Sequence, residues 1–141
     1  MTRDSQREAG SAGPNGRRIR TLIVDDSAVA LETLGSFLEM QTCFAVVGVA
    51  HNGEQAVSLA EALCPELVLM DLQMPKMNGL EATKRLKAQR DAPRIIIVTA
   101  TDSALLRAAA SAVGADGFVS KPDLFEQLPP LLRTLFCGRK T

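Results

Sequence analysis

The segment IRTLIVDD, residues 19–26, and the segment LVLMD, residues 67–71, each place carboxylates directly after a short apolar run. Aliphatic and β-branched runs of this length predict buried strands. If the two strands are parallel neighbours, Asp25, Asp26 and Asp71 converge at one edge of a sheet. Carboxylates that close repel one another, which either raises their pKa values strongly or calls for a bound cation. An oxygen-lined site of this kind suits Mg²⁺.

Further strand-like runs alternate with helical patterns along the rest of the chain. Ser27 is expected to cap the first helix, and Pro65 is expected to stop the second. Proline is accepted in the first turn of a helix, so Pro129-Pro130 predicts that the principal turns of the last helix begin near Pro129. The expected strands cover residues 21–24, 44–49, 66–70, 94–98 and 117–120, and the expected helices cover 27–40, 54–64, 80–92, 103–113 and the segment from about 129.

The alternation predicts an α/β fold with a five-stranded parallel sheet covered by five helices. Continuously apolar strands agree with burial on both faces. Among doubly wound sheets, the flavodoxin-like order 2-1-3-4-5 is a common choice. Ligands in such sheets bind beyond the carboxyl ends of the strands, at the switch point between strands one and three. This is the place predicted for Asp25, Asp26 and Asp71, so the fold and the acidic motif point to the same site.

Composition bounds the class of protein. The chain has 141 residues, 46% of them hydrophobic, which suits one globular domain. Sixteen basic and sixteen acidic residues give no bulk charge that would favour a nucleic-acid or membrane partner. No apolar run approaches the length of a membrane span, and the N-terminus lacks the apolar region of a secretory signal.

The expected domain organisation is a disordered leader at residues 1–18, one domain at 19–137 and a short tail at 138–141. No output domain is expected after the last helix, and Met1 with the short ending favours a complete protein over a piece of a longer regulator. Cys43, Cys64 and Cys137 lack metal-ligand spacing and are expected to be buried or partly buried thiols. A reduced, cytoplasmic protein is the simplest interpretation.

Two further side chains follow apolar runs and could join the same edge of the sheet. Thr99 comes after the fourth expected strand and Lys121 after the fifth. A hydroxyl and an ammonium beside three carboxylates form a collection suited to handling a phosphoryl group.

Taken in order, these motifs resemble the receiver domain of two-component response regulators, of the stand-alone, chemotaxis type, from about Arg20 to Phe136. Each motif alone is weak evidence, but their order at successive strand ends is very specific. The markers are Asp25-Asp26, Asp71 with the following LQMPKMNG (residues 72–79), Thr99-Ala100, and GADGF (residues 114–118) leading to Lys121-Pro122.

The resemblance implies a role for each acidic residue. Asp71 matches the phosphoacceptor, a carboxylate nucleophile that takes a phosphoryl group from a kinase phosphohistidine. Asp26 resembles the direct metal ligand, while Asp25 resembles the acid that acts largely through metal-bound water. The backbone carbonyl of Gln73 is expected to be a further Mg²⁺ ligand.

The resemblance also implies which residues respond to a phosphoryl group on Asp71. Thr99 matches the hydroxyl that bonds a phosphoryl oxygen, and Lys121 matches the lysine that pairs with it. The Lys121-Pro122 bond is expected to be cis. Phe118 takes the position of the aromatic switch residue, which turns inward as Thr99 moves, although an aromatic residue there could also be plain core.

The implied function is a signalling phosphoacceptor rather than an enzyme with turnover. Its phosphodonor would be a histidine kinase or histidine phosphotransfer protein. Its output would pass through the face formed by helix four, strand five and helix five, to a protein partner, to a second copy in a homodimer or along a relay. Direct nucleic-acid or membrane binding is not expected.

Two alternatives from other classes remain open on the sequence. A Mg²⁺-dependent phosphatase of the haloacid-dehalogenase type also uses an aspartyl nucleophile, but it needs a D-x-D arrangement and a cap for which the chain has no length. A flavodoxin-like cofactor binder needs a Ser/Thr/Gly-rich phosphate loop after the first strand. Asp25-Asp26 at that place would repel a cofactor phosphate.

Overall fold

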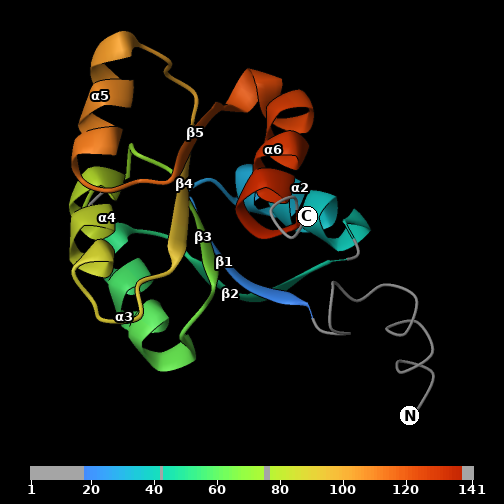
Figure 1. Cartoon of the computed structure of the whole chain (residues 1–141), viewed down its shortest axis with the longest axis horizontal. Helices are drawn as coiled ribbons and strands as arrows, with labels where there is room; N and C mark the ends of the chain where they lie inside the picture. Colours follow the sequence, from blue (N-terminus) through green and yellow to red (C-terminus); the bar gives the residue numbers. More distant parts are fainter. Residues whose placement is uncertain (1–17, 42, 75–76, 138–141) are drawn as a thin grey trace.

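The fold is a five-stranded parallel sheet with helices on both faces, as the sequence predicts (Figure 1). The computed structural model describes residues 18–41, 43–74 and 77–137, without the side chain of Cys137. The strand order is β2-β1-β3-β4-β5, and all four neighbouring pairs are parallel. The strands are β1 (Ile19–Val24), β2 (Phe44–Ala50), β3 (Leu67–Met70), β4 (Arg94–Thr99) and β5 (Gly117–Ser120).

The helices divide between the two faces of this sheet. One face is covered by α2 and α6, and the other by α3, α4 and α5 (Figure 1). The helices are α2 (Ala28–Met40), α3 (Gly53–Leu63), α4 (Gly79–Lys87), α5 (Ala104–Ala112) and α6 (Leu124–Leu132), with a 3₁₀ turn η2 (Lys121–Asp123) before α6 and a π-helical turn η3 (Arg133–Cys137) after it. Within the described residues, no helix combines the length and apolar character that a membrane crossing needs.

Two hydrophobic cores lie on the two faces of the sheet, because successive side chains of a strand point to opposite sides. In β3, Leu67 and Leu69 join the core under α2 and α6, whereas Val68 and Met70 join the core under α3, α4 and α5. All four side chains are fully buried. The burial on both faces that the continuous apolar strands predict is therefore confirmed.

Four helices begin with a side-chain cap. Ser27 Oγ accepts a hydrogen bond from Ala30 N at 3.2 Å, which confirms the expected start of α2. Asn52, Asn78 and Ser103 cap α3, α4 and α5 in the same way. A cap occupies one of the unpaired N–H groups of the first turn, so each helix start has a defined position after its strand. These starts border the edge of the sheet where the acidic residues lie.

The last helix differs from the sequence prediction. We expected its principal turns to begin near Pro129, but α6 begins at Leu124 and runs through Pro129 and Pro130. Each interior proline costs about 3 kcal/mol because it removes a hydrogen bond and crowds the preceding turn. Leu124, Leu128 and Leu132 lie one turn apart and are all buried. Burying each leucine contributes about 1.5–3 kcal/mol, which offsets the local cost.

The Lys121–Pro122 bond also differs from expectation. The resemblance implied a cis bond, but none of the peptide bonds in the described residues is cis. Lys121 and Pro122 belong to the turn η2, which leads directly into α6. Proline is readily accepted in such a first turn, and an X–Pro bond ordinarily favours trans by about 0.5–1 kcal/mol.

The leader expected at residues 1–18 and the tail expected at 138–141 fall almost entirely outside the described residues, as do Pro75 and Lys76 of the motif after β3. Arg18 is the single residue of the expected leader that is described. The expected domain boundaries stay predictions.

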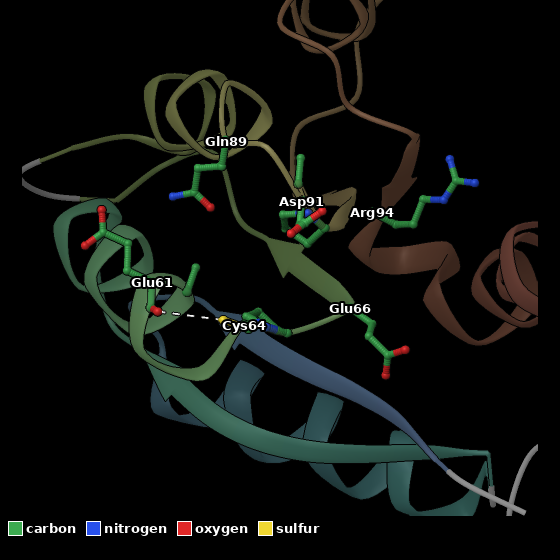
Figure 2. A pocket seen from close by; sticks show the side chains of 10 residues that line it. Glu61, Cys64, Glu66, Gln89, Asp91 and Arg94 are labelled. Atoms are coloured by element: carbon green, nitrogen blue, oxygen red, sulfur yellow. Dashed lines mark hydrogen bonds between the residues drawn. The ribbon is translucent and has the colours of Figure 1, made fainter.

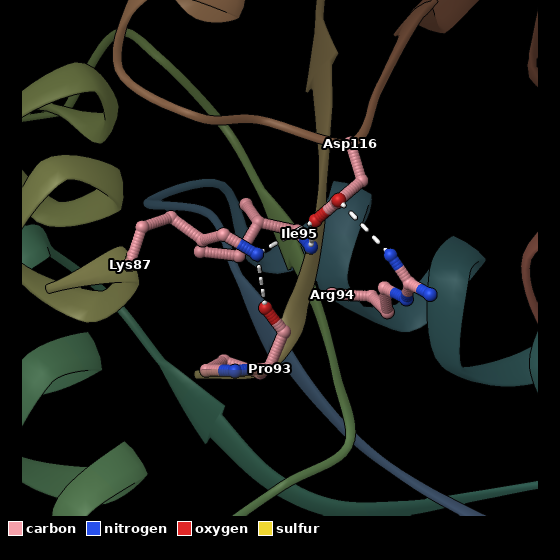
Figure 3. A network of polar contacts seen from close by, with 5 residues as sticks. All are labelled: Lys87, Pro93, Arg94, Ile95 and Asp116. Atoms are coloured by element: carbon pink, nitrogen blue, oxygen red, sulfur yellow. Dashed lines mark hydrogen bonds and ion pairs between the residues drawn. The ribbon is translucent and has the colours of Figure 1, made fainter. Parts of the chain in front are cut away.

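A polar network joins α4 to the amino-terminal end of β4 and to the loop before β5 (Figure 3). The Asp116 carboxylate accepts hydrogen bonds from Lys87 Nζ at 3.0 Å and from the backbone N–H of Ile95 at 2.8 Å, and Arg94 approaches its other oxygen at 3.4 Å. Lys87 Nζ also donates to Pro93 O at 2.9 Å. Only 16% of the Asp116 side chain is exposed, so these contacts are not freely exchanged with water.

Replacing Asp116 by alanine should therefore destabilise the protein by about 2 kcal/mol, because the Ile95 N–H loses its acceptor and the partly buried Lys87 ammonium loses one of its two acceptors. Urea unfolding of Asp116→Ala should show a lower midpoint with an unchanged slope. Asp91→Ala, an exposed position in the loop before β4, is the matched control and should stay within about 0.5 kcal/mol of wild type. Equal midpoints for the two variants would contradict this assignment.

Candidate functional site

The three acidic residues meet at the carboxyl ends of β1 and β3. Asp25 follows β1 directly and Asp71 follows β3 directly, and Val24 and Met70 are paired in register. The Asp71 N–H continues the ladder by donating to Val24 O at 3.0 Å. Carboxylate oxygens of Asp25, Asp26 and Asp71 all lie within 4.8 Å of one another. The convergence predicted from the strand ends is present.

The three carboxylates differ in their surroundings. Asp25 and Asp71 are buried, with 1% and 5% of the residue exposed, whereas Asp26 is exposed. Asp25 Oδ1 accepts a hydrogen bond from Ser27 N at 2.9 Å, and Asp71 Oδ1 accepts one from Leu72 N at 2.9 Å. Each buried carboxylate is thereby oriented by the backbone that follows its own strand.

Lys121 brings one positive charge to this cluster. Its Nζ lies 2.7 Å from Asp25 Oδ2 and 3.8 Å from Asp71 Oδ1. The contact between Lys121 Nζ and Asp25 Oδ2 lacks hydrogen-bond geometry. Asp25 Oδ2 is therefore buried without a hydrogen-bond donor from the described residues. One ammonium against three carboxylates leaves two negative charges when all four groups are ionised.

Burial and the neighbouring charges together change the pKa of Asp71. Its pKa is raised from 3.8 to about 6, first by burial and then by the negative charge of Asp25, with a smaller effect from Asp26. Lys121 and the hydrogen bond from Leu72 N act in the opposite direction but do not cancel the increase. A positive charge at the cluster would therefore lower the free energy of the ionised site.

The residues present fit a divalent cation. Three carboxylates from two neighbouring strands offer the hard oxygen ligands that Mg²⁺ prefers, and Asp25 Oδ2 is a buried oxygen with an unused lone pair. Asp25, Asp26 and Asp71 could hold such an ion. Gln73 lies in the loop just beyond Asp71 and is exposed. The role of its carbonyl as a ligand stays a prediction.

Thr99 lies on β4, the neighbour of β3, and Phe118 lies on β5, the edge strand beyond β4. Thr99 ends β4, is fully buried and is paired in register with Ser120, the residue before Lys121. Its Oγ1 accepts a long hydrogen bond from Thr101 N at 3.4 Å. Phe118 on β5 is partly buried against the core under α3, α4 and α5. The Thr99 hydroxyl and the Lys121 ammonium thus lie at the carboxyl ends of neighbouring strands, beside the acidic residues. Phe118 lies two residues before the end of β5.

Sequence reasoning missed the role of Gly79, the first residue of α4. Gly79 N donates to Leu72 O at 3.0 Å, which folds the loop after β3 back onto the site. A Cβ at this position would collide with the backbone carbonyl of Asp71. Asn78-Gly79 was recognisable as a turn signal, but the close approach depends on how the loop returns to the strand.

A pocket of about 620 Å³ lies elsewhere, at the amino-terminal ends of β3 and β4 (Figure 2). Cys64, Glu66 and Arg94 line it, and none of the acidic site residues does. The expectation of buried or partly buried thiols is confirmed for Cys43 and wrong for Cys64, which is exposed at the carboxyl-terminal cap of α3. The side chain of Cys137 lies outside the described structure.

Comparisons with known proteins agree on one family. The model of the response regulator receiver domain matches residues 21–133. The transcriptional regulatory protein YdfI of Bacillus subtilis is 40% identical over 109 residues, which are 77% of this chain and 51% of that protein. A protein-glutamate methylesterase/protein-glutamine glutaminase of Halalkalibacterium halodurans is 39% identical over 106 residues, which are 74% of this chain and 31% of that protein.

Solved structures give the same answer. The response regulator domain of Thermotoga maritima CheB has a TM-score of 0.74 and 35% identity, covering 84% of this chain and 93% of that one. A LuxR-family response regulator from Aurantimonas sp. SI85-9A1 has a TM-score of 0.80 and 30% identity, covering 86% and 87%. The chain spans about half or less of the length of the two curated relatives, YdfI and the methylesterase/glutaminase. With its fold, its acidic strand-end cluster and this match over residues 21–133, the chain belongs to the family of response regulator receiver domains.

Proposed function

We propose that Asp71 accepts a phosphoryl group from a phosphohistidine and that this modification is the signal the protein carries. The observation that supports this most is the cluster of Asp25, Asp26 and Asp71 with the Lys121 ammonium, at the strand ends of a receiver domain. The family match gives the phosphatase and cofactor-binding alternatives no support.

In the proposed transfer, an oxygen of the Asp71 carboxylate attacks phosphorus as the bond between phosphorus and the donor imidazole nitrogen breaks. The bonding electrons stay on that nitrogen, and the imidazole leaves as the neutral base once a proton balances the charge. Carboxylate and phosphoryl group are both negative, so Lys121 and the backbone N–H of Leu72 are well placed to offset charge near the reacting oxygens. A Mg²⁺ ion held by Asp25, Asp26 and Asp71 would supply further charge neutralisation and alignment of the phosphoryl group. Thr99 would hydrogen-bond one phosphoryl oxygen of the product.

The test is labelling with radioactive acetyl phosphate, a small phosphodonor that needs no kinase. Wild type should take up label only with Mg²⁺, and the label should be lost under conditions that hydrolyse acyl phosphates. Asp71→Asn and wild type with EDTA should each fall by at least about 100-fold, because one removes the nucleophile and the other the charge neutralisation. Asp91→Asn, an exposed aspartate in the loop before β4, should label like wild type. Acid-labile acyl phosphate on Asp71→Asn would contradict the assignment.

The proposed phosphorylation needs a protein that donates the phosphoryl group and a partner that responds to it. We infer that the phosphodonor is a histidine kinase or histidine phosphotransfer protein and that the reader is a protein partner or a second copy of the chain. The face formed by α5, β5 and α6, which corresponds to helix four, strand five and helix five of the sequence analysis, is the proposed contact surface. Phosphotransfer from purified kinases would identify the donor. The expected cytoplasmic location and the absence of turnover also stay predictions.

A further inference from the structure

Arg107 on α5 connects two segments that surround the proposed site. Its Nε and Nη2 donate to the two carboxylate oxygens of Asp102, at 2.8 and 3.1 Å. Its guanidinium carbon also lies 4.6 Å from the centre of the Phe118 ring. A planar guanidinium can do both at once, because its edge donates hydrogen bonds while its face stacks on a ring.

Asp102 links this contact to Thr99. It lies in the loop between β4 and α5, directly after Thr101, whose N–H donates to Thr99 Oγ1. That hydrogen bond is 3.4 Å long, at the weak end of the range. A short chain of contacts therefore runs from Thr99 through Asp102 and Arg107 to Phe118.

Phe118 lies between the core and the Arg107 cation. Its ring is only partly buried, and it packs on one side against the core under α3, α4 and α5. The guanidinium of Arg107 lies over the ring and attracts it through the negative charge of the aromatic face. Phenylalanine has no polar group that could anchor the ring in another way, so the cation is the specific contact in this arrangement.

We propose that Asp102 and Arg107 form a latch that holds Phe118 in its observed position while Asp71 carries no phosphate, and that movement of Thr99 toward a phosphoryl group loosens it. This inference rests on the proposed function. Arg107 and Asp102 have exposed fractions of 45% and 41%, so water can replace their contacts at low cost. The latch is thus weak enough to be released by one covalent modification. Arg107 is a positioning residue, since it contacts none of the carboxylates of the site.

Fluorine NMR of the full chain can test the latch. The chain has five phenylalanines, so labelling with 4-fluorophenylalanine gives five resonances, and Phe118→Leu identifies the one from Phe118. Beryllofluoride with Mg²⁺, a mimic of the phosphoryl group, is titrated into each variant. Removing the cation in Arg107→Met should shift the free Phe118 resonance toward its beryllofluoride-bound position.

The same variant should bind beryllofluoride with a half-saturation about 2- to 5-fold lower, since a cation–π contact at an exposed site corresponds to about 0.5–1 kcal/mol. Arg107→Lys keeps a cation near the ring and should remain within about twofold of wild type. Arg85→Met is the matched control, because it breaks the exposed pair with Glu81 on α4, away from Phe118. It should leave both the resonance and the half-saturation unchanged.

The outcomes separate the two proposals. If wild type binds beryllofluoride but Phe118 does not respond, or if Arg107→Met behaves like Arg85→Met, the latch is overturned. If wild type shows no Mg²⁺-dependent binding of beryllofluoride, the proposed function itself fails.

Discussion

Without a divalent metal, Asp71→Asn should be about 3 kcal/mol more stable than wild type at pH 7.5. The folded protein raises the pKa of Asp71 from 3.8 to about 6, and each pKa unit corresponds to about 1.4 kcal/mol. Asparagine removes the buried charge beside Asp25 and keeps an oxygen for the hydrogen bond from Leu72 N. The measurement is urea unfolding in EDTA at a series of pH values.

The pH dependence has a defined sign. Below pH 3.8 the carboxyl group is protonated in both folded and unfolded chains, so the two proteins should have similar stability. Between pH 3.8 and about 6 the unfolded chain ionises first, so wild type loses stability relative to the variant as the pH rises. Above about pH 7 the difference should be constant.

With Mg²⁺, wild type should become more stable than Asp71→Asn, because the ion binds the folded wild type and stabilises it by mass action. The variant, with one carboxylate fewer, should gain much less from the metal. Asp91→Asn is the control and should track wild type at every pH. A stability difference that persists unchanged at pH 3.5 would show that the charge of Asp71 is not its cause.

Gly79→Ala should destabilise the protein by about 3 kcal/mol, at the upper end of what overpacking costs. The added methyl group collides with backbone atoms of Asp71 and Leu72, which cannot rotate away as a flexible side chain can. Either α4 or the residue that carries the proposed nucleophile must shift. We therefore expect slower labelling by acetyl phosphate together with a lower urea midpoint.

Gly35→Ala is the matched control for this prediction. Gly35 lies inside α2, and its added Cβ would meet only Ile23 Cδ1, at 4.0 Å, which is an ordinary contact. Alanine in a helix interior should raise stability by about 0.5–1 kcal/mol relative to glycine. If Gly79→Ala were as stable as Gly35→Ala, the close approach at Asp71 could not be present in solution.

The two corrections show the limit of a local pattern in α6 and the limit of a family resemblance at Pro122. The start of α6 was predicted too late because Pro129 and Pro130 are strong local signals, whereas the leucines that outweigh them act only through burial against the sheet. The cis Lys121–Pro122 bond was predicted from resemblance alone, whereas the observed bond has the trans form that an X–Pro bond ordinarily favours. Contacts outside the segment therefore decide the start of α6, but the Pro122 bond needs no such contact.

The sequence by itself determined the strand ends, the strand order and the residues gathered at the acidic edge. A short apolar run that ends in Asp25 or Asp71 is a local feature, and parallel βα units bring the carboxyl ends of their strands to one side. Only the tertiary structure decided that Lys121 lies closer to Asp25 than to Asp71, that burial raises the pKa of Asp71, and that Arg107 covers Phe118. These features depend on distances between separate segments and on the exclusion of water, and packing of the whole domain sets both.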